Sequence, residues 1–170
     1  MKKSLALCAA LFVLLVGCRG KKTTQVGEPD WVSDQSQEGL AFQAPADWTS
    51  SKIADTTVYT TPQKQVMTVN TVQSANRSGD ILNTADREDF YFIARQEARD
   101  DHFTSEDVID IGGQNGLRVG YETLNGMELM YVVHVGVVKE DRMYFFAFLM
   151  PENANDPSDF DRVVSTARFL

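Results

Sequence analysis

Two stretches near the end of the chain are apolar on both faces, and they limit the fold more than any other feature. In residues 130–138, Tyr131 and Val133 belong to one apolar face of a strand, and Val132 belongs to a second. Residues 143–150 repeat this pattern with several aromatic side chains. A strand that is apolar on both faces must be covered on both sides. The sequence therefore predicts an α+β fold in which a central antiparallel sheet lies between helical or loop layers.

Turn signals divide the rest of the folded part into hairpins and helices. Asn125-Gly126 favours a tight turn before the strand 130–138, and the charged run 139–142 is predicted to join this strand to the next one. Earlier strands are predicted at 40–44, 56–61 and 65–73. Helical spacing of apolar residues predicts helices over 84–101 and after Asp156-Pro157. We expect Phe169 and Leu170 to pack against the sheet.

The beginning of the chain has the features of an export signal. Lys2 and Lys3 precede an apolar run over 5–16, which is followed by Gly17 and Cys18. About 12 helical residues cover about 18 Å, whereas the hydrocarbon core of a bilayer is about 30 Å thick, so the run is too short to span a membrane.

The sequence Leu15-Val16-Gly17-Cys18 resembles the signal of bacterial lipoproteins. The resemblance implies cleavage between Gly17 and Cys18, a diacylglycerol thioether on Cys18, and usually acylation of the new amino terminus, for example with palmitate. Two or more chains make such anchoring stable. The alternative is an ordinary signal peptide with a chance cysteine.

Cleavage at this site would determine the composition of the mature protein. Removal of residues 1–17 leaves 153 of the 170 residues, enough for one domain with a sizeable core. Two lysines and no acid leave with the signal, so the net charge changes from −8 to −10, and nucleic acid is an unfavourable partner. Cys8 is discarded and Cys18 is lipidated, which excludes disulfides, cysteine-ligated zinc and thiol nucleophiles. Arg19, in place of an aspartate, favours the outer membrane facing the periplasm if the cell is Gram-negative.

Three regions are expected: a signal peptide over 1–17, a flexible lipid-anchored stalk over 18–36, and a globular domain over 37–170. The stalk prediction depends on the polar composition of this segment and its lack of periodicity. Trp31 is the one large apolar side chain there, and we expect it to dock on the domain rather than to lie at the membrane interface.

Few residues are candidates for chemistry. His102 is interpreted as a helix-end residue and His134 as a hydrogen-bonded core imidazole, in preference to catalytic or metal-binding roles. The acidic pair Glu97 and Asp101 shares one helix face. A second acidic group lacks the glycine and terminal glutamate of a calcium loop, and it is interpreted as a solvated loop; it contains Glu152, Asn155, Asp156 and Asp159. The glycines at 112, 113 and 116 are assigned to a turn between strands. We therefore expect no catalytic residue, metal or cofactor.

Four segments together resemble the PsbP-like superfamily, which includes bacterial DcrB-type and LpqN-type lipoproteins. They are Leu40-Ala41-Phe42 through Pro45-Ala46-Asp47-Trp48, Ile111-Gly112-Gly113-Gln114-Asn115-Gly116-Leu117-Arg118, Arg142-Met143-Tyr144-Phe145-Phe146, and Phe160-Asp161-Arg162-Val163-Val164-Ser165-Thr166-Ala167-Arg168-Phe169. The resemblance covers residues 37–170 and implies an α-β-α sandwich. It also implies a role in binding, because relatives of this fold act as extrinsic photosystem II subunits or as a partner of the Ran GTPase and carry no common catalytic residues.

These observations lead to one expected function and two alternatives. The expected function is a non-catalytic, lipid-anchored module that binds an unidentified protein of the cell envelope. The first alternative is a carrier or sensor of a small soluble ligand, with a hollow between sheet and helix lined by Tyr91, Tyr144 and Phe146. The second is a divergent hydrolase, which requires polar groups around His102 or His134.

Overall fold

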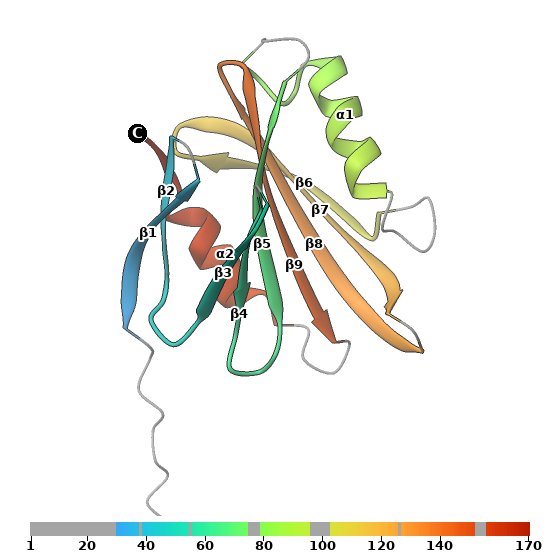
Figure 1. Ribbon diagram of the computed structural model, residues 1–170. Helices are drawn as coiled ribbons and strands as arrows, with labels where there is room; N and C mark the ends of the chain where they lie inside the picture. Colours follow the sequence, from blue (N-terminus) through green and yellow to red (C-terminus); the bar gives the residue numbers. More distant parts are fainter. Residues whose placement is uncertain are drawn as a thin grey trace, which may run out of the picture.

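Strands dominate the structure, a computed structural model that describes residues 30–37, 39–54, 56–74, 79–95, 103–125, 127–151 and 156–170. Its elements are β1 (Trp31–Gln37), β2 (Leu40–Pro45), β3 (Thr49–Ile53), β4 (Thr56–Thr60), β5 (Val66–Gln73), α1 (Thr84–Arg95), β6 (Ser105–Ile111), β7 (Gln114–Asn125), β8 (Glu128–Lys139), β9 (Arg142–Pro151), α2 (Ser158–Ser165) and β10 (Arg168–Phe169). The fold is of the α+β class, as predicted (Figure 1). Within these described ranges, no helix is long and apolar enough to cross a membrane.

The larger sheet has seven strands in the order β3-β4-β5-β9-β8-β7-β6, and all neighbouring strands are antiparallel. The predicted hairpins β4–β5, β7–β8 and β8–β9 are all present. At the β8–β9 turn, Lys139 and Arg142 are register partners, with Glu140 and Asp141 between them. The long strands β8 and β9 therefore lie in the middle of the sheet, as their apolar sequences require.

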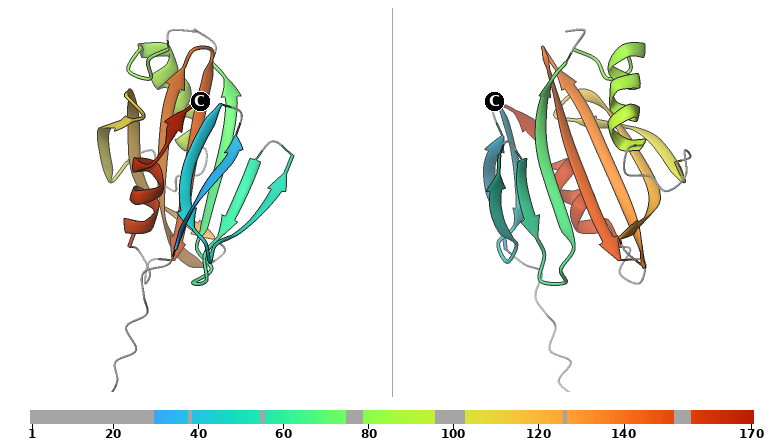
Figure 2. Two further views of the ribbon diagram at one scale, coloured as in Figure 1. Left: turned by 90° about the vertical axis from the view of Figure 1, so that its left-hand side faces the viewer. Right: turned by 45° about the vertical axis from the view of Figure 1, so that its right-hand side comes forward.

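Both faces of this sheet are buried. On one face, Phe90 and Ala94 of α1 pack with Val132 of β8. On the opposite face, Phe160 of α2 packs with Val133 of the same strand. Neighbouring residues of a strand point to opposite faces, so β8 contributes to both clusters. Figures 1 and 2 show α1 on one side of the seven-stranded sheet, with α2 and the strands β1, β2 and β10 on the other.

A second sheet, with the order β1-β2-β10, helps to cover the α2 side, and its first strand lies partly within the predicted stalk. Residues 31–36 are therefore not a flexible stalk but part of a strand, and the folded part begins before residue 37. Trp31 pairs with Pro45 in register, and its ring lies 4.1 Å from the Arg162 guanidinium carbon. The prediction that Trp31 docks on the domain is confirmed.

The end of the chain closes this second sheet. Phe169 is half-buried in β10, and its ring centre lies 5.5 Å from that of Tyr144. Leu170 is 72% exposed, so the prediction that both residues pack inward is right for Phe169 and wrong for Leu170. Successive side chains of an extended chain point to opposite sides, so the two residues cannot both face the core. The Leu170 amide donates a hydrogen bond to the Gly39 carbonyl (3.0 Å).

Candidate functional site

Several residues singled out from the sequence lie outside the described part of the chain: Gly17, Cys18, Glu97, Asp101, His102, Glu152 and Asn155. Signal cleavage and lipidation of Cys18 therefore remain predictions. The acidic loop is described only at Asp156 and Asp159, and Asp156 accepts a hydrogen bond from the Ser158 amide (3.0 Å) at the start of α2. This contact gives Asp156 a local structural role.

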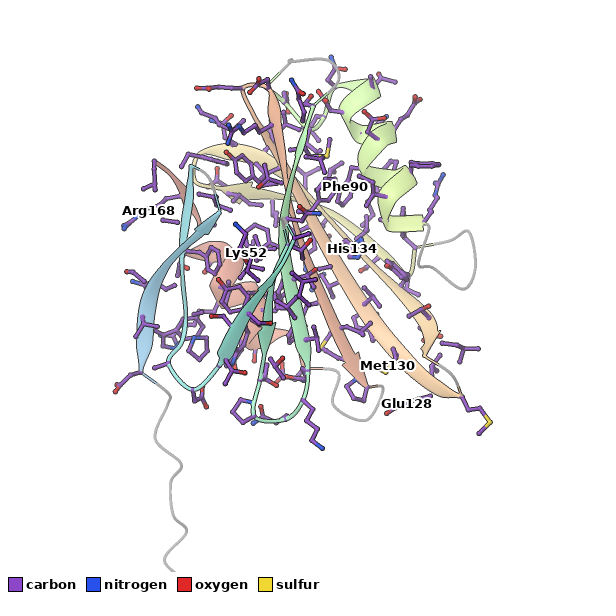
Figure 3. All side chains as sticks on the ribbon, in the orientation of Figure 1. Lys52, Phe90, Glu128, Met130, His134 and Arg168 are labelled. Atoms are coloured by element: carbon purple, nitrogen blue, oxygen red, sulfur yellow. The ribbon has the colours of Figure 1, made fainter. Side chains whose placement is uncertain are left out.

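His134 lies deep in β8, on the face covered by α1. It is 4% exposed, and its Nε2 atom is 3.3 Å from the Tyr121 hydroxyl, with the two rings edge to face. Burial lowers the pKa of His134 to about 4, because the charged imidazolium would lose its hydration. Figure 3 shows His134 and Phe90 in the part of the molecule between the sheet and α1. A neutral, buried imidazole is the core residue that the sequence indicated, and it is not accessible to a substrate.

Asp86 is also buried, within the first helical turns of α1. Its carboxylate accepts a 2.5 Å hydrogen bond from the Ser74 hydroxyl, which follows β5. The Ser74 amide in turn donates to the Asp141 carbonyl (2.7 Å), so the contacts connect α1, β5 and the β8–β9 turn. This arrangement joins elements of the fold and leaves the carboxylate away from solvent.

The predicted aromatic hollow is not formed, because its three residues lie on different faces of the sheet. Tyr91 extends from α1 and its hydroxyl donates a hydrogen bond to Glu106 of β6. Tyr144 and Phe146 belong to the opposite face, with α2 and β2. Partial burial and the hydrogen bond to Glu106 raise the pKa of Tyr91 to about 12, so it is a neutral phenol at physiological pH. A carrier site lined by these three side chains is therefore excluded.

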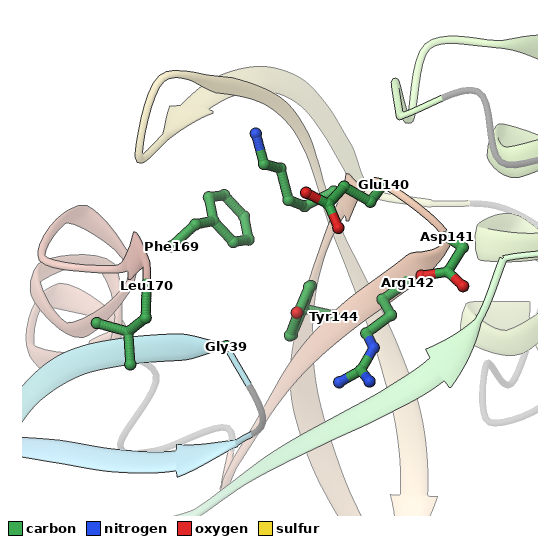
Figure 4. A pocket seen from close by; sticks show the side chains of 8 residues that line it. Gly39, Glu140, Asp141, Arg142, Tyr144, Phe169 and Leu170 are labelled. Carbon is green, nitrogen blue, oxygen red and sulfur yellow. The ribbon is translucent and has the colours of Figure 1, made fainter.

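A pocket of about 230 Å³ lies where three separate segments meet: the β1–β2 turn, the β8–β9 turn and the end of the chain. We call it the turn pocket, and Figure 4 shows it from close by. It is lined by Gly39, Lys139, Glu140, Asp141, Arg142, Tyr144, Phe169 and Leu170.

Register explains why charged groups gather in the turn pocket. Lys139 and Arg142 are directly opposite each other, so both project to the same face as Tyr144, two residues further along β9. The Lys139 ammonium lies 6.0 Å from the centre of the Phe169 ring. Glu140 adds a carboxylate from the turn, where its backbone has a φ of 57°. The pocket thus combines two cations and two acids with two aromatic rings.

Gly39 is essential to the shape of the turn pocket. Its φ is +78°, and a Cβ atom at this position would lie 3.1 Å from the Tyr144 hydroxyl oxygen. Any other residue would be strained and would press on the pocket wall. The predicted turn between β6 and β7 likewise uses positive φ at Gly112 and Gly113, whereas Gly116 lies within β7 and fits against Ile111.

Cationic side chains of the turn pocket can hold a carboxylate, its acids can hold an ammonium group, and its rings can contact an apolar stem. No described residues form a group of three or more His, Cys, Asp or Glu side chains placed to hold a metal. Sequence reasoning missed the pocket because its walls come from positions near 39, 140 and 170; the opposed cations at 139 and 142 were its only local signal.

Comparisons with known proteins support the fold. No family model matches the sequence, and no curated protein matches it. The solution structure of cyanobacterial PsbP (CyanoP) from Synechocystis sp. PCC 6803 is similar with a TM-score of 0.61 and 19% identity, over 83% of this chain and 92% of that one. A crystal structure from Bacteroides thetaiotaomicron VPI-5482 is similar with a TM-score of 0.58 and 10% identity; the match covers 84% of this chain but only 49% of that protein.

A third structure is less similar. It is LpqN of Mycobacterium tuberculosis, described as involved in cell envelope biogenesis, with a TM-score of 0.47 and 9% identity over 82% of this chain and 90% of that one. The similarity to CyanoP extends over almost the whole of that protein and over most of this chain. The protein therefore has a PsbP-like fold.

Proposed function

We propose that the protein is a lipid-anchored, non-catalytic module that binds another protein of the cell envelope. Its domain is then an α-β-α sandwich of the PsbP type, with the three-stranded sheet as an addition on the α2 side. In a Gram-negative cell, the module would be held at the outer membrane and would face the periplasm.

One observation carries this proposal: the turn pocket lies at the end of the domain opposite the start of β1. In Figures 1 and 2, the views are related by rotation about the vertical axis, and in each of them β1 begins near the lower end while the β8–β9 turn is at the upper end. Twelve residues, 19–30, separate Cys18 from Trp31. At about 3.3–3.6 Å per residue they reach at most about 43 Å, so an anchor on Cys18 would keep the lower end near the membrane and leave the turn pocket accessible.

The turn pocket fits a protein partner better than it fits a reaction. Its charged side chains of both signs are near-surface groups that give specificity and orientation in a protein interface. We expect a partner that inserts a short segment with a charged end between Lys139, Arg142 and the Tyr144–Phe169 rings.

In-cell crosslinking tests this function. A photo-crosslinking amino acid is placed at Glu140, and the matched control places it at Val108, which is 59% exposed on the edge strand β6. The purification tag is inserted after Lys22, because a tag following Leu170 would obstruct the pocket. We expect one reproducible envelope partner from position 140, none from position 108, and loss of that partner in Cys18→Ala. Equal products from positions 140 and 108 would contradict the proposed binding surface.

A small-ligand carrier is the second candidate function, and the volume of the turn pocket is the observation that favours it. About 230 Å³ is slightly below the usual range of ligand pockets and would accommodate a small molecule with both an ammonium and a carboxylate group. Thermal unfolding with a panel of amino acids distinguishes the two. A ligand-dependent rise in melting temperature that is lost in Arg142→Gln would favour the carrier.

A further inference from the structure

The β7–β8 hairpin extends beyond the rest of its sheet. Strands β7 and β8 remain paired as far as Asn125 and Glu128, whereas β9 reaches only to the Met130–Pro151 pair. Figure 3 shows Glu128 and Met130 at this lower end of β8. The last rungs of the hairpin therefore have no neighbouring strand on the β9 side.

Two of the side chains at this end are apolar and exposed, and a third, Leu129, is half-buried. Leu124 is 47% exposed and lies directly opposite Leu129, and Met127 is fully exposed, at 102%. We call Leu124, Met127 and Leu129 the hairpin tip. A completely exposed methionine makes no contribution to packing within the domain, so the fold itself does not account for it.

The hairpin tip and the start of β1 lie at the same end of the molecule. In Figure 1 and in both views of Figure 2, the paired ends of β7 and β8 and the beginning of β1 are near the lower end. The views differ only by rotation about the vertical axis, so this agreement in height does not arise from overlap. A lipid on Cys18 would hold the start of β1 within about 43 Å of the membrane, the extended reach of residues 19–30.

We infer that the hairpin tip contacts the surface of the bilayer in which the Cys18 lipid is inserted. This inference rests on the proposed lipid anchoring. The anchor makes the second contact intramolecular, so a few apolar side chains suffice where they would not recruit a free domain. The contact tilts the seven-stranded sheet so that its lower end faces the lipid and the turn pocket faces away.

The charges beside the hairpin tip select the type of lipid. Glu122 and Glu128 are exposed on the same hairpin, and the tip itself contains no cation. Two carboxylates next to an anionic surface would be repelled. The hairpin tip therefore suits zwitterionic headgroups, such as those of phosphatidylethanolamine or phosphatidylcholine.

After signal cleavage, Cys18 would be the only cysteine in the sequence, and its thiol would carry the lipid. A cysteine introduced elsewhere can therefore be labelled selectively in the full lipidated protein. Met127→Cys is labelled with a thiol-reactive fluorophore, and the protein is reconstituted in phosphatidylcholine vesicles with brominated acyl chains. Val108→Cys and Glu140→Cys serve as matched controls at exposed positions away from the hairpin tip. Because position 127 makes no packing contacts, the substitution leaves folding intact.

We expect bromine to quench the label at position 127 at least about threefold more than either control, since apolar tips enter the boundary between headgroups and acyl chains. Quenching should fall when phosphatidylglycerol replaces much of the neutral lipid; an increase would overturn the preference for zwitterionic headgroups. Equal, weak quenching at all three positions would overturn the inference. A blue-shifted but unquenched label at position 127 would also overturn it, because it would show contact with protein instead.

Failure of the anchor and failure of the contact are distinguishable. Intact mass and vesicle flotation report whether Cys18 carries lipid, with Cys18→Ala as the control. An unlipidated protein that does not float contradicts the proposed function. A lipidated protein that floats, but whose label at position 127 remains in water, contradicts only the contact of the hairpin tip.

Discussion

His134 illustrates how one buried side chain ties stability to pH. Its imidazole is uncharged in the folded protein because burial lowers its pKa to about 4, from an ordinary value of 6.5. In the unfolded chain the same group takes up a proton at about pH 6.5. The unfolded state therefore binds more protons than the folded state between these two values, and acidification favours unfolding.

The free energy of unfolding should fall by about 3 kcal/mol between pH 7 and pH 4 through His134 alone. This contribution is fully present above pH 6.5 and is lost as the pH falls toward 4. Urea unfolding of the wild type and of His134→Gln at several pH values gives the free energy of unfolding as a function of pH. Carboxylates affect both proteins alike, so the difference between the two pH profiles measures the contribution of His134. Parallel pH profiles for the two proteins would refute this role, and His102→Gln is the control.

At the scale of the elements, the position of α1 depends on a close approach between helix and sheet. Gly136 of β8 lies directly beneath Phe90, and a Cβ atom there would come within 2.4 Å of the Phe90 ring. The ring also stacks on Phe145, with centres 5.8 Å apart, which limits its freedom to move. Gly136 therefore sets the distance between α1 and the sheet.

Gly136→Ala should lower the free energy of unfolding by about 1–3 kcal/mol, because the added methyl group overpacks a filled core. Phe90→Leu provides the matched test, since a smaller side chain leaves room for the methyl group. Urea unfolding of both single variants and the double variant should give a favourable coupling energy. Simple additivity of the two losses would argue against the contact.

The elements also show which parts of the fold were accessible to sequence reasoning. The hairpins of β7, β8 and β9 were predicted because their apolar residues recur with the period of a strand. β1 and β3 were not: the first has the sequence Trp-Val-Ser-Asp-Gln-Ser-Gln, and the second is exposed along its whole length. Such strands form because a neighbouring strand offers hydrogen bonds, and a polar sequence does not indicate that such a strand is present. The turn pocket was missed for a related reason, because segments far apart in sequence build it.

For the whole molecule, the most important correction concerns where the domain begins. β1 supplies one edge of the second sheet and brings Trp31 against Arg162. Without β1, the mostly buried strand β2 would be left with an open edge.

A fragment of residues 30–170 should therefore be monomeric and clearly more stable than one of residues 38–170. Loss of the buried part of Trp31 and of the β1–β2 hydrogen bonds should lower the melting temperature by about 10 °C or more, since large apolar truncations cost several kcal/mol. Thermal unfolding and size-exclusion chromatography measure the difference. Equal melting temperatures of the two fragments would instead support a globular domain that begins at residue 37.

Trp31 is the first residue of β1 and Gly39 lies in the turn that follows this strand, and this has a mechanical consequence if the chain is anchored and its turn pocket is occupied. Tension between the membrane and the partner would then act on β1 at Trp31 and on the turn pocket next to the other end of the strand. It would run along the strand, so the rungs between β1 and β2 would be loaded together in shear rather than opened one after another. The short second sheet would serve as the load-carrying joint between the tether and the rest of the domain.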